Sequence, residues 1–138
     1  MVEINLTSND VILNVKGNDH PFMLYRKAGV PVALSTDDEG IARIDLTHEY
    51  VRAAETYHLN YLDLKLMART SLEHAFLPGA SLWQSRTPER LDRPVTVCAG
   101  QLGRETPSGE CAKFIAESQK AQQEWELERR LRAFEASF

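Results

Sequence analysis

Long apolar runs, a leader segment and an excess of basic side chains are all missing from this sequence. The apolar stretch from Val30 to Thr36 is far shorter than the ~20 residues that a helix needs to cross a bilayer, which argues against a membrane-spanning chain. Met1 is followed at once by Glu3 and Asn5, without the basic and apolar regions of a signal peptide. We therefore expect no membrane partner; the sequence favours a cytoplasmic location for this chain but does not fix the compartment.

Basic residues are also too few to suggest a nucleic-acid partner. The 16 lysines and arginines are outnumbered by 20 aspartates and glutamates, which gives a formal net charge of −4. Proteins that bind the phosphate backbone usually present a basic face. This balance therefore argues against nucleic-acid binding.

Cysteine is nearly absent, because only Cys98 and Cys111 occur. Two cysteines are too few for a disulfide scaffold, and the sequence leaves open whether they form one bridge or stay reduced. They have neither a CxxC spacing nor a nearby histidine pair. The pattern therefore argues against a zinc knuckle or zinc finger.

The chain does contain enough apolar residues, 43% of 138, to bury the core of one domain. Alternating apolar residues over Val2–Leu6 predict a short strand, and Thr7–Asp10 has the composition of a turn. A helix is predicted over His20–Ala28, with Gly29 at its end, and Val30–Leu34 is typical of a strand buried on both faces. The order strand, helix, strand predicts a βαβ unit with parallel strands.

Two helices are predicted after this unit. Thr47 is a suitable N-cap for the first. Asn60 and Asp63 have the spacing of a capping box for the second, which is expected to end at Pro78-Gly79.

The rest of the chain changes in character. Residues 81–107 hold several prolines and glycines without a sustained period, and we interpret them as a surface excursion. A final helix is predicted from Ser108 onward. The expected organisation is a β/α portion over residues 1–77, an irregular portion over 78–107 and a helical portion over 108–138.

The residues most suggestive of chemistry are Asp37 and Asp38, which follow directly on the predicted buried strand. In a parallel sheet this position is the C-terminal edge, where α/β proteins place their sites. A carboxylate there can bind a divalent metal, accept a proton or accept a hydrogen bond from a substrate. The alternative is a solvated turn in which either aspartate caps backbone amides, and spacing alone favours that alternative.

A family resemblance changes this balance. The chain resembles the C-terminal part of the metal-dependent adenosine deaminases from Glu3 to about Leu77, with weaker similarity in the last helix. Four separated runs carry the resemblance: Asp19-His20-Pro21-Phe22, Ala28-Gly29-Val30-Pro31-Val32-Ala33-Leu34-Ser35-Thr36-Asp37-Asp38, Leu46-Thr47-His48-Glu49-Tyr50 and Asp63-Leu64-Lys65-Leu66-Met67-Ala68-Arg69-Thr70-Ser71-Leu72-Glu73-His74-Ala75-Phe76-Leu77.

The resemblance implies an α/β fragment: the last two β/α units of a (β/α)₈ barrel, followed by a mostly helical C-terminal region. Val2–Leu6 would be the seventh strand and Pro31–Leu34 the eighth. Asp37 then matches the aspartate that ligates the catalytic zinc, and Asp38 matches the aspartate that hydrogen-bonds the purine ring. Ser8 matches a substrate-site serine.

This sequence departs from the family just before that serine. Asn5-Leu6-Thr7 stands where a Cys-Pro pair is common, which puts the wall of the site near Ser8 in doubt.

The chemistry implied by the resemblance is the hydrolytic deamination of an adenosine-type purine nucleoside, with a zinc-activated water as nucleophile. A complete barrel needs ~250 residues, so this chain is predicted to be incomplete. The other zinc-binding histidines and the catalytic glutamate and histidine of the family have no counterpart here. The four histidines present, His20, His48, His58 and His74, fall in predicted helices. The sequence predicts weak or absent zinc binding and no turnover by this chain alone.

Two further hypotheses stay open. The chain could be a non-catalytic module derived from such an enzyme, which binds the missing N-terminal barrel portion or associates with itself through strand edges, since two strands cannot stand alone. Val30–Leu34 carries no charge to block such pairing. The other hypothesis is a small helical interaction protein with an incidental Asp-Asp turn.

Overall fold

The computed structural model describes residues 1–138 apart from the side chain of Glu89. It has a mixed α/β fold that is mostly helical, with two strands and seven α-helices in the described residues. The chain divides into two compact units, Met1–Ser71 and Leu72–Phe138. None of the described helices is both long and apolar enough to cross a membrane.

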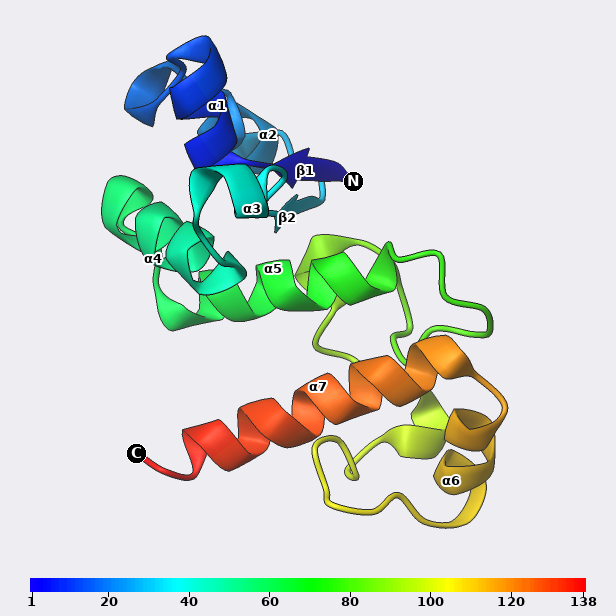
Figure 1. Cartoon of the computed structure of the whole chain (residues 1–138). Coiled ribbons are helices and arrows are strands. Elements are labelled where there is room, and N and C mark those ends of the chain that lie inside the picture. The colour runs from blue at the N-terminus through cyan, green and yellow to red at the C-terminus, as the bar shows by residue number, and fades with distance from the viewer. The chain divides into compact units, whose positions relative to one another are not determined.

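The first unit is built around two short parallel strands, β1 (Val2–Ile4) and β2 (Val32–Leu34), which lie side by side in Figure 1. The register pairs Val2 with Val32 and Ile4 with Leu34. The connection between them contains α1 (Leu6–Leu13), the 3₁₀ helix η1 (Gly17–Asp19) and α2 (Phe22–Lys27). The predicted βαβ unit is therefore confirmed.

The turn that returns the chain to β2 uses Gly29. This residue has φ 69°, a left-handed conformation that glycine adopts without a Cβ penalty. The amide of Gly29 donates to the carbonyl of Arg26 at 3.0 Å, and the amide of Val30 donates to that of Tyr25 at 3.0 Å. Gly29 thus ends α2 as its position in the sequence predicted.

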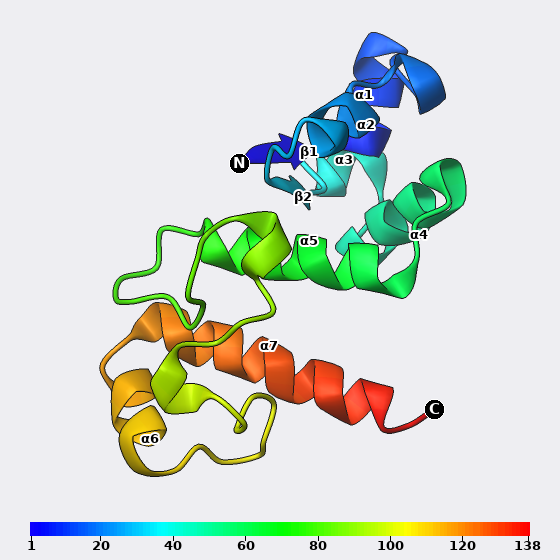
Figure 2. The same ribbon diagram turned by 180° about the vertical axis from the view of Figure 1, so that it is seen from behind.

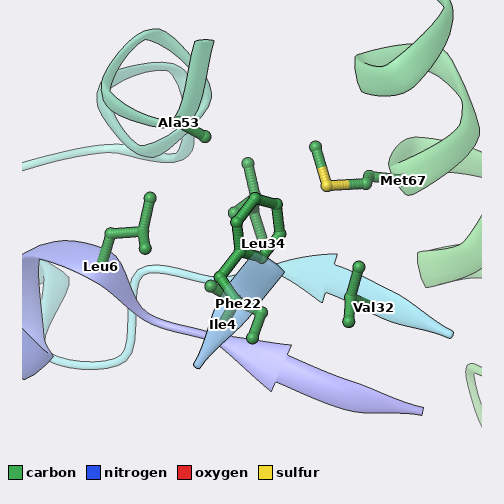
Figure 3. Close-up of a cluster of buried hydrophobic side chains, with 7 residues drawn as sticks. All are labelled: Ile4, Leu6, Phe22, Val32, Leu34, Ala53 and Met67. Carbon is green, nitrogen blue, oxygen red and sulfur yellow. The ribbon is translucent and has the colours of Figure 1, made fainter. Parts of the chain in front are cut away.

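One apolar cluster holds the first unit together. Its buried members come from both strands and from the helices packed on one face of them (Figure 3): Ile4, Leu6, Phe22, Val32, Leu34, Ala53 and Met67. Phe22 is fully buried, and its ring centroid lies 4.8 Å from that of Tyr57. Because strand side chains alternate between faces, Glu3 and Ala33 point away from this cluster.

Three more helices complete the first unit. They are α3 (Glu39–Ala42), α4 (Leu46–Tyr57) and α5 (Tyr61–Glu73), whose last residues already belong to the second unit. The N-cap of α4 is Asp45, whose side chain accepts from the His48 amide at 2.8 Å, so the predicted Thr47 cap is wrong by two residues.

The capping box at the start of α5 is confirmed. The Asn60 side chain accepts from the Asp63 amide at 3.1 Å, and the Asp63 carboxylate accepts from the Asn60 amide at 3.0 Å. Two otherwise unpaired amides are satisfied in this reciprocal way.

The turn predicted over Thr7–Asp10 is wrong, because these residues form the body of α1. Ser, Asn and Asp favour turns when their side chains bond nearby backbone. Here those side chains have partners far along the sequence instead, as described below. The predicted end of α5 at Pro78-Gly79 is also corrected: the helix stops at Glu73, and Phe76 beyond it is fully exposed.

The second unit contains the 3₁₀ helices η2 (Pro88–Arg90) and η3 (Thr96–Cys98) and the α-helices α6 (Gly109–Ala116) and α7 (Gln119–Glu135), which follow one another in Figure 2. As far as the structure describes them, residues 81–107 contain only these two 3₁₀ helices as regular helical structure, but they are not confined to the surface, since Leu82, Trp83 and Leu91 are buried. These apolar residues do not recur at helical or strand spacing, so their pattern did not predict that they are buried.

The single helix predicted over 108–138 is two helices, α6 and α7. Ser118 separates them, because its side chain accepts from the Ala121 amide at 3.1 Å and donates to the carbonyl of Ala80 at 2.6 Å. Cys98 and Cys111 form a disulfide between η3 and α6, which resolves the state that the sequence left open.

Candidate functional site

The C-terminal ends of β1 and β2 bring two of the predicted site residues together. Ser8 lies in the first turn of α1, just after β1, and Asp37 follows β2. The Ser8 hydroxyl donates to Asp37 Oδ2 at 2.8 Å. Ser8 is buried and Asp37 is exposed, so the bond joins a fixed donor to a carboxylate that faces solvent.

The backbone at Asp37 is unusual. Asp37 has φ 54°, as do Asn14 and His58, and Arg43 has φ 53°. The other three are C-cap residues of helices, where the left-handed conformation is common, whereas Asp37 comes after a strand. Such a conformation persists only where its surroundings impose it, and it is often found at functional sites.

Asp38 occupies the N-cap position of the short helix α3. Its carbonyl accepts from the amides of Ile41 at 3.1 Å and Ala42 at 2.8 Å, but its side chain makes no capping bond. The alternative in which the Asp38 side chain caps backbone amides is therefore not observed. Asp38 is half-buried, and its carboxylate does not cap the helix that it begins.

Helix α4 holds the first turn of α1 in place. Glu49 is fully buried, and both of its carboxylate oxygens lie 3.3 Å from the Thr7 amide nitrogen. A carboxylate at a helix N-terminus interacts favourably with the unpaired amides there. Because Thr7 immediately precedes Ser8, Glu49 fixes the backbone from which the Ser8 hydroxyl reaches Asp37.

Arg52, one turn after Glu49 on α4, adds two bonds to the same turn of α1. Its guanidinium donates to Thr7 Oγ1 at 3.1 Å and to Asp10 Oδ2 at 2.5 Å. The hydrogen bonds from Arg52 and Lys16 hold the pKa of Asp10 below its ordinary value. The polar side chains of Thr7, Ser8 and Asp10 thus bond to residues far along the chain rather than to nearby backbone, so this segment stays helical.

His20 performs a structural task at the same turn. It is buried, its Nδ1 accepts from the Phe22 amide at 3.1 Å, and its Nε2 lies 2.9 Å from Asn9 Oδ1. With Nδ1 as acceptor, Nε2 carries the proton and donates to Asn9. Burial lowers the pKa of His20, which favours this neutral form.

Sequence reasoning missed Glu49, Arg52 and Asn9 as parts of this arrangement. Glu49 and Arg52 are three residues apart and share a face of α4, but the partner of that face is 42 residues away in sequence for Glu49 and Thr7. No local pattern identifies such a partner. Their spacing of three residues indicates only that both side chains lie on the same face of the helix.

A cavity of about 310 Å³ lies beside the strand ends. Glu3, Ala33 and Thr36 are among the residues that line it, together with Leu46 of α4 and Ser71 of α5.

The residues present do not by themselves fit a zinc ion. Among the described residues, no three His, Cys, Asp or Glu side chains converge into a group that could hold a metal. A catalytic zinc normally has three protein ligands, and Asp37 supplies one exposed carboxylate.

Comparison with known proteins identifies the family. Residues 1–83 match the family model described as adenosine deaminase. The chain belongs to the adenosine deaminase family. The resemblance on which the site residues were predicted is therefore confirmed, and the first unit is a fragment of an adenosine deaminase domain.

Three curated adenosine deaminases illustrate how much of the family this chain contains. It is 34% identical to that of Shewanella loihica over 59 residues, which is 43% of this chain and 18% of the relative. It is 34% identical to that of Clostridium perfringens over 61 residues, 44% of this chain and 18% of the relative. For Enterococcus faecalis the values are 32% over 78 residues, 56% of this chain and 23% of the relative.

The chain thus spans less than a quarter of the length of these adenosine deaminases. None of the solved structures matches the chain. Residues 84–138, most of the second unit, lie outside the family match.

Proposed function

We propose that this chain is the C-terminal segment of a zinc-dependent hydrolase that deaminates adenosine-type purine nucleosides, and that it has no turnover alone. The observation that carries the proposal is the bond from Ser8 to Asp37 at the C-terminal ends of two parallel strands. This is the sheet edge where α/β enzymes place their reacting groups.

Three residues have distinct roles in this proposal. Asp37 contributes one carboxylate to the zinc, Ser8 orients that carboxylate through its hydroxyl, and Asp38 accepts a hydrogen bond from the purine ring. The positive φ of Asp37 and the uncommitted side chain of Asp38 are what a binding role requires. The remaining zinc ligands and the groups that transfer protons come from another polypeptide portion.

The partner in this proposal is the missing N-terminal portion of the barrel. Strands β1 and β2 form a two-stranded sheet in which each strand has one neighbour in the described residues. A barrel removes such edges by closing the sheet. In the proposal β1 and β2 are the seventh and eighth strands, and the face with Glu3 and Ala33 turns toward the barrel interior.

A complementation assay tests the function. The purified chain is mixed with the portion of the Enterococcus faecalis adenosine deaminase that precedes its matched segment, in zinc-containing buffer, and ammonia release from adenosine is followed. We expect no release from either part, measurable release from the mixture, and at least a hundredfold loss with Asp37→Asn. Asp92→Asn, an exposed change of the same charge in the second unit, should keep the activity.

Two outcomes contradict the proposal. Deamination by the pure chain that scales with its concentration contradicts its inactivity alone. Release from the mixture that Asp37→Asn leaves unchanged contradicts the role of Asp37.

The second candidate is a non-catalytic module that associates through its strand edges. Strand β2 carries no charged side chain, and β1 is its one neighbour in the described sheet. Both features favour this candidate. Sedimentation of the purified chain distinguishes the two: dimers or larger assemblies support self-association, whereas a folded monomer at high concentration counts against it.

A further inference from the structure

The second unit buries charged side chains that the proposed function does not use. Glu73, at the end of α5, is 0% exposed, and Glu124 on α7 is 1% exposed. Lys120, one turn before Glu124, is 6% exposed. Burying an ionised carboxylate is costly unless it is paired and hydrogen-bonded, so the partners of these two glutamates decide their charge.

Glu73 is fully bonded. Its Oε2 accepts from the Ser81 hydroxyl at 2.5 Å and its Oε1 accepts from Arg86 Nε at 2.6 Å. Its main-chain carbonyl accepts from Lys120 Nζ at 2.6 Å. The ammonium of Lys120 is therefore directed to the end of α5.

In the part of the chain that the structure describes, only one of the two carboxylate oxygens of Glu124 accepts a hydrogen bond. Its Oε2 accepts from the Leu82 amide at 2.7 Å, while its buried Oε1 finds no hydrogen-bond partner among the described residues by ordinary geometric criteria. Burial raises the pKa of Glu124 to about 8, and the adjacent Glu73 carboxyl adds to this, although the Leu82 amide and Lys120 oppose it. Once protonated, Oε1 is a donor rather than an unpaired acceptor, and the neighbouring Glu73 carboxylate can accept from it.

We propose that Glu124 is protonated in the folded chain and forms with Glu73 a clasp that fastens α7 to the segment 73–86, and that this clasp opens when Glu124 loses its proton. The clasp lies at the end of the family match, because Glu73, Ser81 and Leu82 are inside it whereas Lys120 and Glu124 are outside it. It attaches the C-terminal region, which the family match does not include, to the deaminase-like segment. The inference does not depend on the proposed function.

The charges around the pair are mixed. Arg86 is 69% exposed at its side chain, so solvent screens its attraction, and it bonds Glu73 rather than Glu124. His74 follows Glu73, and burial lowers its pKa. Glu128, one turn beyond Glu124 on α7, is buried and adds a further acidic group on the same side.

The sign of the pH effect follows from the raised pKa of Glu124. The stabilisation is fully present below the ordinary glutamate value of 4.5 and is lost as the pH rises toward about 8. In this window the folded chain holds a proton that the unfolded chain has released, so the unfolded form gains population with pH.

The chain offers a built-in reporter for this unit. Both of its tryptophans, Trp83 and Trp125, are buried in the second unit. Urea unfolding of the full chain followed by tryptophan fluorescence therefore reports on the second unit, while circular dichroism reports on the whole chain.

The test compares pH 6 with pH 9. For the unaltered chain we expect the unfolded-to-folded ratio, extrapolated to water, to rise at least roughly tenfold between these pH values. Glu124→Gln has an amide N–H donor at every pH, so it should make this ratio nearly independent of pH. Glu117→Gln, an exposed change of the same charge between α6 and α7, should keep the dependence of the unaltered chain.

The proposal is overturned if the unaltered chain shows no pH dependence in this window, or if Glu124→Gln retains it. Should Glu124→Gln fail to fold, carbon-13 NMR of the unaltered chain decides the same question. One glutamate carboxyl should titrate between pH 7 and 9, and the absence of such a carboxyl overturns the clasp.

Discussion

The two units of this chain reach a buried core by different means. The first unit has a core of apolar side chains from two strands and four helices, and the polar bonds that hold α1 lie at its margin. The second unit has no strand pairing beyond one isolated bridge, Trp83 with Pro94, in the described residues. Beside its buried apolar side chains, it holds a disulfide and several buried glutamates and a lysine.

The difference shows what regular elements provide. Strands and helices satisfy their own backbone groups, so their buried faces can be purely apolar. Residues 78–107 have little regular structure, and side chains must replace the missing backbone partners. Glu124 accepts from the Leu82 amide and Ser118 donates to the Ala80 carbonyl for this reason.

The largest expected effect is on the apolar core of the first unit. Phe22→Ala removes a fully buried ring and should lower the free energy of unfolding of that unit by ~3–5 kcal/mol. Circular dichroism during urea unfolding should show an early transition, while the tryptophan transition of the second unit stays in place. Simultaneous loss of both signals would contradict the independence of the two units.

Reduction of the disulfide should have the next largest effect, and it should be confined to the second unit. Cys98 and Cys111 are 13 residues apart, so opening the bridge should cost about 3 kcal/mol by the loop-entropy estimate. Dithiothreitol should lower the urea midpoint of tryptophan fluorescence. The Cys98→Ser variant should show the lowered midpoint without reductant, and an unchanged midpoint in both would contradict the comparison.

The smallest expected effect concerns the site. Ser8→Ala removes the hydroxyl that donates to Asp37 and should cost ~1–1.5 kcal/mol in the stability of the first unit. Circular dichroism during urea unfolding measures the loss. Ser71→Ala, an exposed change of the same atoms in the same unit, should cost almost nothing. An equal loss in both variants would mean that the bond to Asp37 contributes no stability.

The parts of the fold that the sequence predicted are those with local signals. Each of these signals involves residues that are close together in the chain. They are the period of β1, the apolar run of β2, Gly29 after α2, and the capping box of Asn60 and Asp63. The place of Asp37 at the end of β2 was predicted from the same kind of local signal, whereas Ser8 was predicted from the family resemblance. The zinc and purine roles of Asp37 and Asp38 stay predictions.

The parts that the sequence did not predict depend on distant partners. Thr7–Asp10 has turn composition, but Glu49 and Arg52 bond it as a helix from 42 or more residues away. In the second unit, Leu82 and Leu91 have no periodic neighbours that would mark them as core. Leu82 lies against α7, where Glu124 accepts from its amide, and α7 comes later in the chain.

The bridge between Cys98 and Cys111 also makes a closed covalent ring of the chain between them, including the exposed residues Arg104 and Glu105. A protease that cuts once inside this ring leaves both products attached to each other. Trypsin cleavage after Arg104 would therefore leave the apparent mass of the chain unchanged on a non-reducing gel. The same sample would separate into two pieces once a reductant is added.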